Sequence, residues 1–139
     1  MAGKRLLCLD VGDVRIGIAM SDPLQMIASP HSVYKRVGWG PDTRHVKALF
    51  DEYDCEKIIC GLPLNMDGSE GFQAEKVKQL AQCFVKAGMP VEFQDERLTT
   101  VSAEDILLED NMRREDRKKN VDKVAAAFIL ESYMNEHPR

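Results

Sequence analysis

The sequence predicts an α/β fold: a single domain over residues 1–139, with a mixed five-stranded sheet and helices on both faces. A length of 139 residues suits one domain with a sizeable core. The composition, 44% hydrophobic and 30% charged, is typical of a globular protein, and no apolar run approaches the ~18 residues of a membrane span. Three strand-like segments come first, and strands then alternate with helices, which indicates antiparallel strands followed by parallel ones.

The first three strands are expected in the N-terminal quarter of the chain. Residues 5–11 form an apolar run that contains one aspartate, and residues 15–20 form a second run. Gly12-Asp13 has the turn chemistry of a hairpin between them. A third strand is expected within 26–37, where Pro30 indicates an edge position or an irregularity.

Helices then separate two short strands. The three-four spacing of apolar residues predicts a helix over about 41–53, and residues 57–60 form a buried strand. The loop 61–71 leads into a second helix, for which Gly88 is a natural C-cap. The second short strand covers 91–94.

The C-terminal third is expected to be helical around one charged loop. Thr99 or Thr100 can cap a helix whose first turn carries acidic residues. Residues 110–119 are expected to form the loop, and the last helix is expected to start at Asn120 and end near Asn135. Trp39, between two glycines, is expected in a loop folded onto the surface.

Charge and cysteine content restrict the function classes. The net charge of −4 argues against a protein that coats nucleic acid generally, although residues 113–119 hold five basic residues in seven positions. The four cysteines lack the spacing of a zinc site and are expected to be reduced thiols. The N-terminus runs directly into the first strand without room for a signal peptide, so a cytoplasmic location is expected.

Asp10 is the most informative residue of the first strand. Strand alternation places it on the same face as Leu6 and Cys8, in an apolar setting where a lone charge is costly. The charge must be neutralised by a proton, by a basic partner such as Arg15 across the hairpin, or by a bound cation.

Two further acidic positions stand where they could approach Asp10. Asp95-Glu96 follows the strand 91–94, and alternation does not choose between the two residues. Asp122 shares a helical stripe with Ala126, Ile129 and Tyr133, unless it is only an acid placed favourably in a first helical turn. Three converging carboxylates would form a hard oxygen site suited to Mg²⁺ or Mn²⁺, and such ions can activate water for phosphodiester cleavage.

Four segments carry a family resemblance. In chain order they are 10–19 (DVGDVRIGIA), 61–69 (GLPLNMDGS), 95–101 (DERLTTV) and 121–127 (VDKVAAA). They resemble the YqgF/RuvX family of bacterial proteins, and together they cover the chain from about Arg5 to Tyr133. Asp13 departs from the small or uncharged residue expected at its turn position, and a carboxylate there would repel a phosphate backbone.

The resemblance implies an RNase H-like fold and a metal-dependent nuclease. By motif position, Asp10, Glu96 and Asp122 match the catalytic, metal-binding acids of the family. The family is associated with maturation of the 5′ end of pre-16S ribosomal RNA, and was also proposed to resolve Holliday junctions, a symmetric substrate that would require a homodimer.

Other polar residues near these motifs are candidates for substrate binding. Arg15 and Arg97 could clamp a phosphate, or could instead pair with the neighbouring acids. Asn65 and Ser69 could hydrogen-bond to sugar or phosphate, or could only stabilise their turn. The basic run, with Arg117, Lys118 and Lys119, is expected to contact the nucleic-acid backbone.

Two other classes of function have to be compared with a nuclease. A ribosome-assembly or nucleic-acid-binding module without catalysis would bind and not cleave. Actin-like kinases and ATPases share the sheet topology and an early Asp-x-Gly turn, but they need two such domains around the nucleotide, which argues against them for a chain of this length.

Overall fold

A computed structural model describes residues 3–65, 67–95 and 114–137, with the backbone alone over 114–122. It contains a five-stranded sheet in the order β3-β2-β1-β4-β5. The strands are β1 (Arg5–Val11), β2 (Arg15–Ser21), β3 (Ala28–Lys35), β4 (Cys55–Leu62) and β5 (Val91–Asp95). β1, β2 and β3 pair antiparallel, whereas β4 pairs parallel with both β1 and β5. The mixed sheet predicted from the sequence is therefore confirmed.

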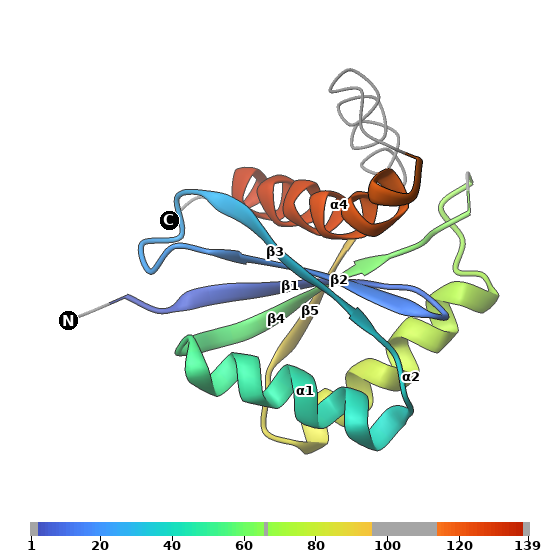
Figure 1. Cartoon of the computed structure of the whole chain (residues 1–139), viewed down its shortest axis with the longest axis horizontal. Coiled ribbons are helices and arrows are strands. Elements are labelled where there is room, and N and C mark those ends of the chain that lie inside the picture. Colours follow the sequence, from blue (N-terminus) through green and yellow to red (C-terminus); the bar gives the residue numbers. More distant parts are fainter. Residues whose placement is uncertain (1–2, 66, 96–113, 138–139) are drawn as a thin grey trace.

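Helices cover both faces of the sheet (Figure 1). α1 (Trp39–Glu52) and α2 (Phe72–Lys86) lie on one face, and α4 (Arg114–Glu136) lies on the other. The alternation of β1 builds both cores: Leu7 and Leu9 belong to the α1/α2 side, whereas Leu6 and Cys8 pack with α4. No helix in the described part of the chain is long and apolar enough to cross a membrane.

Several local predictions are confirmed. β3 is an edge strand, and its register with β2 shifts between Ile18 and Ala19, where Ala19 pairs with Pro30. Gly88 follows the end of α2 with a φ of 93°, a left-handed conformation that glycine adopts without strain. All four cysteines are free thiols, and burial raises the pKa of Cys55 to about 11.

Three predictions about element bounds are wrong. β4 extends from Cys55 to Leu62, twice the predicted length, because pairing with both β1 and β5 orders its ends. Trp39 is the first residue of α1 and not a loop residue. The charged segment expected to be a loop up to residue 119 is helical from Arg114, because Arg, Glu and Lys are themselves good helix formers.

Candidate active site

The carboxyl ends of the three parallel strands meet at one edge of the sheet. Leu9 of β1 pairs with Cys60 of β4, which in turn pairs with Phe93 of β5. One residue further along, Asp10 is level with Gly61 and Gln94, the second-last residues of β4 and β5. Ligands commonly bind at this edge of an open α/β sheet, so the register places Asp10 where a site is expected.

Asp10 itself is half-buried. The four residues Leu6–Leu9 before it are fully buried, and accessibility increases at the last two positions of β1. Since Leu6 and Cys8 pack against α4, alternation places Asp10 on the α4 side, as predicted. Its partial exposure makes a charged carboxylate less costly there than the apolar run suggested.

The alternation of β5 shows on which side of the sheet Asp95 lies. Tyr133 donates a hydrogen bond to Glu92, and Gln94 Nε2 donates one to Glu136 over 3.1 Å, so the even-numbered residues of β5 face α4. Phe93 instead lines a shallow groove with Val85 and Lys86 of α2. Alternation therefore assigns Asp95 to the α2 side of the sheet, opposite Asp10.

The path of α4 brings its middle turns toward the same edge. Tyr133 lies with Leu6 at the start of β1, and α4 and β1 run in roughly opposite directions (Figure 1). The eleven residues back to Asp122 span about 16 Å of helix. The four residues from Leu6 to Asp10 span about 13 Å of strand. The backbone position of Asp122 is thus near the level of Asp10.

The early start of α4 removes one interpretation of Asp122. The sequence placed this acid in a first helical turn, where the helix dipole alone would favour it. With α4 beginning at Arg114, Asp122 follows two full turns later, beyond the range of the dipole effect. The helix dipole therefore does not explain why an acidic residue stands at position 122.

The β1–β2 turn that follows Asp10 is held from both sides. Gly12 N–H donates to the carbonyl of Arg15 over 2.8 Å, and a Cβ on Gly12 would lie 2.9 Å from that same oxygen. Asp13 accepts hydrogen bonds from Gln73 at 3.1 Å and Lys76 at 3.3 Å, both on α2, and these bonds hold the pKa of Asp13 below its usual value. The repulsive carboxylate expected at Asp13 is thus partly neutralised by Lys76.

Asp42 anchors the other side of this turn and was not recognised in the sequence. Its fully buried carboxylate accepts hydrogen bonds from Tyr34 Oη, from Arg36 Nε and from the N–H groups of Val37 and Gly38. Burial alone would raise the pKa of Asp42, but these donors outweigh it and lower the pKa overall. Arg36 Nη1 also donates to the carbonyl of Gly12 over 3.0 Å.

The loop from β4 to α2 satisfies its own polar groups. Asn65 Nδ2 donates to Ser69 Oγ over 3.0 Å, and Ser69 Oγ donates to Asp67 over 2.6 Å. Asn65 N–H also donates to the Ser69 carbonyl. Asn65 and Ser69 thus stabilise their own turn, which is one of the two roles that the sequence left open for them. Both side chains are exposed.

The remaining predicted site residues lie outside what the structure describes. Glu96 and Arg97 are not among the described residues, nor are Thr99 and Thr100. Arg117, Lys118, Lys119 and Asp122 are described by their backbone alone, within α4. Among the described side chains, no three His, Cys, Asp or Glu groups are placed to hold one metal ion. The three-carboxylate site, for which the side chains of Glu96 and Asp122 are not described, stays a prediction.

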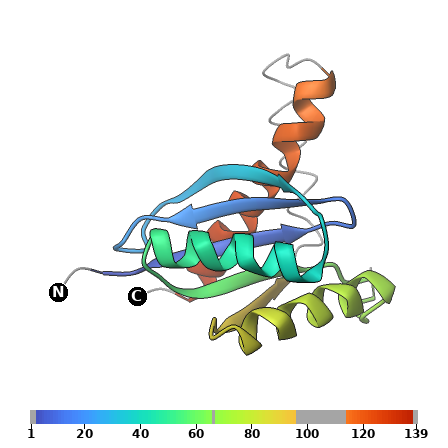
Figure 2. The ribbon, with the colours of Figure 1, turned by 60° about the horizontal axis from the view of Figure 1, so that its bottom comes forward.

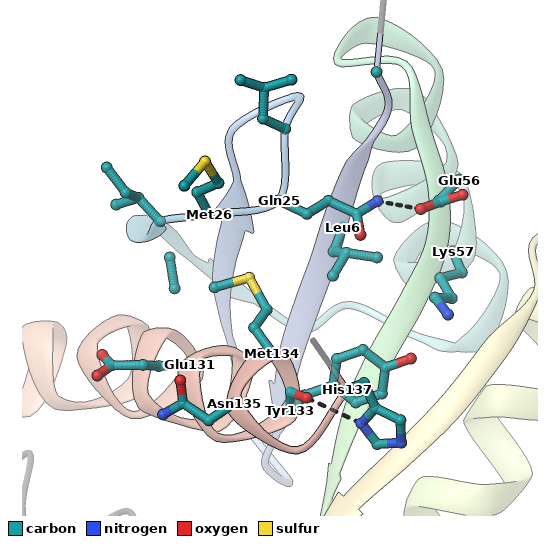
Figure 3. Close-up of a pocket in the computed structure, with 14 residues that line it drawn as sticks. Leu6, Gln25, Met26, Glu56, Lys57, Glu131, Tyr133, Met134, Asn135 and His137 are labelled. Carbon is teal, nitrogen blue, oxygen red and sulfur yellow. Dashed lines mark hydrogen bonds between the residues drawn. The ribbon is translucent and has the colours of Figure 1, made fainter. Parts of the chain in front are cut away.

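A second cavity lies at the opposite end of α4 and has no part in this edge (Figure 3). It has a volume of about 1050 Å³ and lies between the β2–β3 loop, β4 and the end of α4. Lys57 Nζ lies 3.3 Å from Glu92 beside it, and contacts with Tyr133 and Glu92 raise the pKa of Lys57 although burial would lower it. These contacts fix the end of α4 to the sheet.

Comparison with known proteins identifies the family. The family model described as RuvX: Holliday junction resolvase matches residues 4–136. The chain belongs to the RuvX family. RuvX relatives from Clostridium acetobutylicum and Clostridioides difficile, each named "Putative pre-16S rRNA nuclease", are 43% and 45% identical to this chain. The matches cover 94% and 97% of this chain, and 98% and 96% of the relatives.

Solved structures show the same fold at low identity. RuvC from Thermus thermophilus in complex with a Holliday junction substrate superposes with a TM-score of 0.60 at 14% identity, and covers 97% of this chain and 96% of that one. The fowlpox virus resolvase bound to Holliday junction DNA gives 0.57 at 15%, and covers 97% and 99%. This RuvX chain thus has the RNase H-like fold that its motifs implied.

Proposed function

We propose that this RuvX protein is a divalent-metal-dependent nuclease that matures the 5′ end of pre-16S ribosomal RNA in the cytoplasm. The observation that carries the proposal is the position of Asp10. It lies on the α4 side of the sheet, at the edge where the parallel strands end, and in a chain that matches the family over nearly its full length. The names of the curated relatives favour ribosomal RNA as the substrate.

Glu96, and not Asp95, is the second acid of the proposed site. Glu92 and Gln94 face α4, and Asp95 falls on the α2 side of the sheet. With Asp95 on the other side of the sheet, we propose Glu96, the acid that matches the family motif in 95–101. β1 and β5 are separated by β4 alone, so their backbones are about 10 Å apart, within reach of two acidic side chains that share one ion.

Mg²⁺ or Mn²⁺ is the proposed cofactor, held by Asp10, Glu96 and Asp122. Carboxylate oxygens are ligands that both ions prefer, and the half-buried Asp10 fits that donor set. The bound ion would activate water and stabilise the leaving oxygen of the phosphodiester. Around it, Arg15 and Arg97 would orient the phosphate, and Asn65, Ser69 and the basic residues 117–119 would contact the backbone.

The test is cleavage of a precursor RNA containing the 5′ leader in the presence of Mn²⁺. Loss of one carboxylate ligand removes several kcal/mol of charge stabilisation, so Asp10→Asn should lower the rate on the order of a thousand-fold. Asp51→Asn is the matched control, because Asp51 is exposed on α1 and pairs only with Lys47 among the described contacts. Equal cleavage by Asp10→Asn and the parent protein would contradict the assignment.

The alternative substrate is a Holliday junction, as the family description states. A symmetric four-way junction requires two active sites related by a two-fold axis, so this function requires a homodimer. Matched assays on junction DNA and precursor RNA, with the mass in solution measured alongside, distinguish the two substrates. Binding of either without any cleavage would instead indicate an assembly factor that has lost catalysis.

A further inference from the structure

Four of the exposed large apolar side chains gather at one place. Among the described residues, Val14, Val37, Trp39 and Phe72 are 58%, 76%, 46% and 73% exposed. Val14 lies in the β1–β2 turn, Val37 and Trp39 lie at the start of α1, and Phe72 begins α2. Both views of the ribbon place the first turns of α1 and α2 beside that turn (Figures 1 and 2).

A continuous series of contacts connects the two aromatic rings through the turn. Arg36 Cζ lies 5.9 Å from the centre of the Trp39 ring, and Arg36 donates to the Gly12 carbonyl. On the other side, Lys76 Nζ lies 4.6 Å from the centre of the Phe72 ring and 3.3 Å from Asp13. Each exposed ring thus has a cation beside it, and each cation is fixed to the turn that follows Asp10.

The local charge differs from that of the whole molecule. Residues 12–15, 35–44 and 72–76 contain five basic and three acidic side chains, within a chain whose net charge is −4. Asp42 pairs with Arg36 and Asp13 pairs with Lys76, and the excess of two basic residues leaves these segments with a net charge of +2. This surface combines exposed rings with positive charge, the combination on which unpaired nucleotides bind.

We propose that Trp39 and Phe72, with Arg36 and Lys76, form a stacking platform for unpaired bases of the nucleic-acid substrate. The inference rests on the proposed nuclease function and specifies the substrate: a single-stranded segment beside the scissile phosphate. Stacking accepts any base, because every base has an aromatic face, so the platform selects unpaired over paired nucleotides and not one sequence over another. The rings lie on the α1/α2 side of the turn, so the strand passes over this turn to reach Asp10.

Trp39 provides a direct signal, because it is the single tryptophan of the chain. The protein carrying Asp10→Asn, which is expected not to cleave, is titrated with a single-stranded RNA of about ten nucleotides, a length in the range that one such surface covers. Stacking should quench the tryptophan fluorescence. A strand of equal length without bases cannot stack and should leave the fluorescence unchanged. A blunt duplex presents only its two terminal base pairs and should quench the fluorescence far less than the single strand.

Affinity measured with a labelled strand then tests each ring. Trp39→Ala and Phe72→Ala should each weaken binding of the single strand about tenfold, within the range measured for one base stack. Binding of the abasic strand should stay constant, and Trp39→Phe and Phe72→Tyr should retain most of the affinity. Phe93→Ala is the matched control, because Phe93 is an exposed aromatic residue in the α2–β5 groove, away from the turn.

The outcomes separate failure of this inference from failure of the proposed function. Unchanged affinity for the single strand in both alanine variants, with wild-type cleavage of precursor RNA, overturns the platform and leaves the nuclease intact. No binding of any nucleic acid, and no cleavage, overturns both. A surface that binds another protein or a second copy of the chain would appear as concentration-dependent mass that the alanine variants lose, with no effect on RNA affinity, and this result also overturns the platform.

Discussion

Asp42 shows how one buried carboxylate supports a site that it does not enter. Its four donors come from the end of β3 and the residues that lead into α1, and Arg36 extends the network to the carbonyl of Gly12. The network therefore joins the start of α1 to the turn after Asp10. Removing the carboxylate leaves a guanidinium and two backbone N–H groups without their acceptor in a largely buried place.

We expect Asp42→Ala to lower the free energy of unfolding by about 3–5 kcal/mol, the cost of breaking a buried ion pair from one side. Urea denaturation at neutral pH measures it. Asp51→Ala, which removes an exposed i,i+4 pair with Lys47, should cost less than about 0.5 kcal/mol and is the control. A similar loss of unfolding free energy in the two variants would contradict the stabilising role of the Asp42 network.

The same carboxylate predicts a dependence of stability on pH. Because the folded-state pKa of Asp42 is below the ordinary value of 3.8, the charged form is favoured by folding. The stabilisation is complete above pH about 4 and is lost as pH falls through the folded-state pKa. Below about pH 4, the parent protein should therefore lose stability more steeply with falling pH than Asp42→Asn, as measured by denaturation at each pH. If stability fell equally with pH in both proteins, Asp42 would not be a source of the pH dependence.

At the scale of elements, the β1–β2 turn sets the position of Asp10. A methyl group on Gly12 would meet the Arg15 carbonyl at 2.9 Å, so Gly12→Ala must widen the turn two residues after Asp10, at a cost of about 1–3 kcal/mol. Gly88→Ala costs a similar amount, about 1–2 kcal/mol, because of its positive φ at the far end of α2. Cleavage rates measured below both melting temperatures should fall for Gly12→Ala alone. Equal rates would show that the turn does not position the acid.

The element scale also shows which parts of this fold are readable in the sequence. β1, β2 and α2 were predicted well because each buries its own apolar pattern. The ends of β4 and the start of α4 were not, since the former depend on pairing with distant strands and the latter carries a charge run that resembles a loop. Asp10 could be predicted from alternation, whereas Asp42 and the Trp39–Phe72 platform could not, because they depend on contacts between residues far apart in sequence.

The basic residues at the start of α4 give a further prediction. Arg117, Lys118 and Lys119 are consecutive residues within the first turns of α4, where three positive charges close together can attract a nucleic-acid backbone. Replacing all three by alanine should lower the slope of log affinity against log salt by up to about 2 for a single strand, at ~0.7 per phosphate contact. Lys47→Ala on α1 should not change the slope. A triple variant with the parental slope would show that these residues do not contact phosphates.

At the scale of the whole molecule, metal binding and folding must be linked. If Asp10, Glu96 and Asp122 converge, their charges repel one another in the metal-free protein, and an ion bound only by the folded state stabilises it. At a concentration one hundred times its dissociation constant, the ion adds about 2.7 kcal/mol to the free energy of unfolding. Mn²⁺ should therefore raise the melting temperature of the parent protein, and this rise should be absent in Asp10→Asn.

The stability of the proteins without metal shows whether a bound cation or Arg15 balances the charge of Asp10. With three clustered carboxylates, Asp10→Asn relieves repulsion, so its melting temperature without metal should equal or exceed that of the parent protein. With Asp10 paired only to Arg15, the same substitution removes an attraction and lowers the melting temperature, and Mn²⁺ stabilises neither protein. Thermal denaturation of both proteins with EDTA and with Mn²⁺ measures the difference, and lower metal-free stability with no Mn²⁺ effect would contradict the proposed metal site.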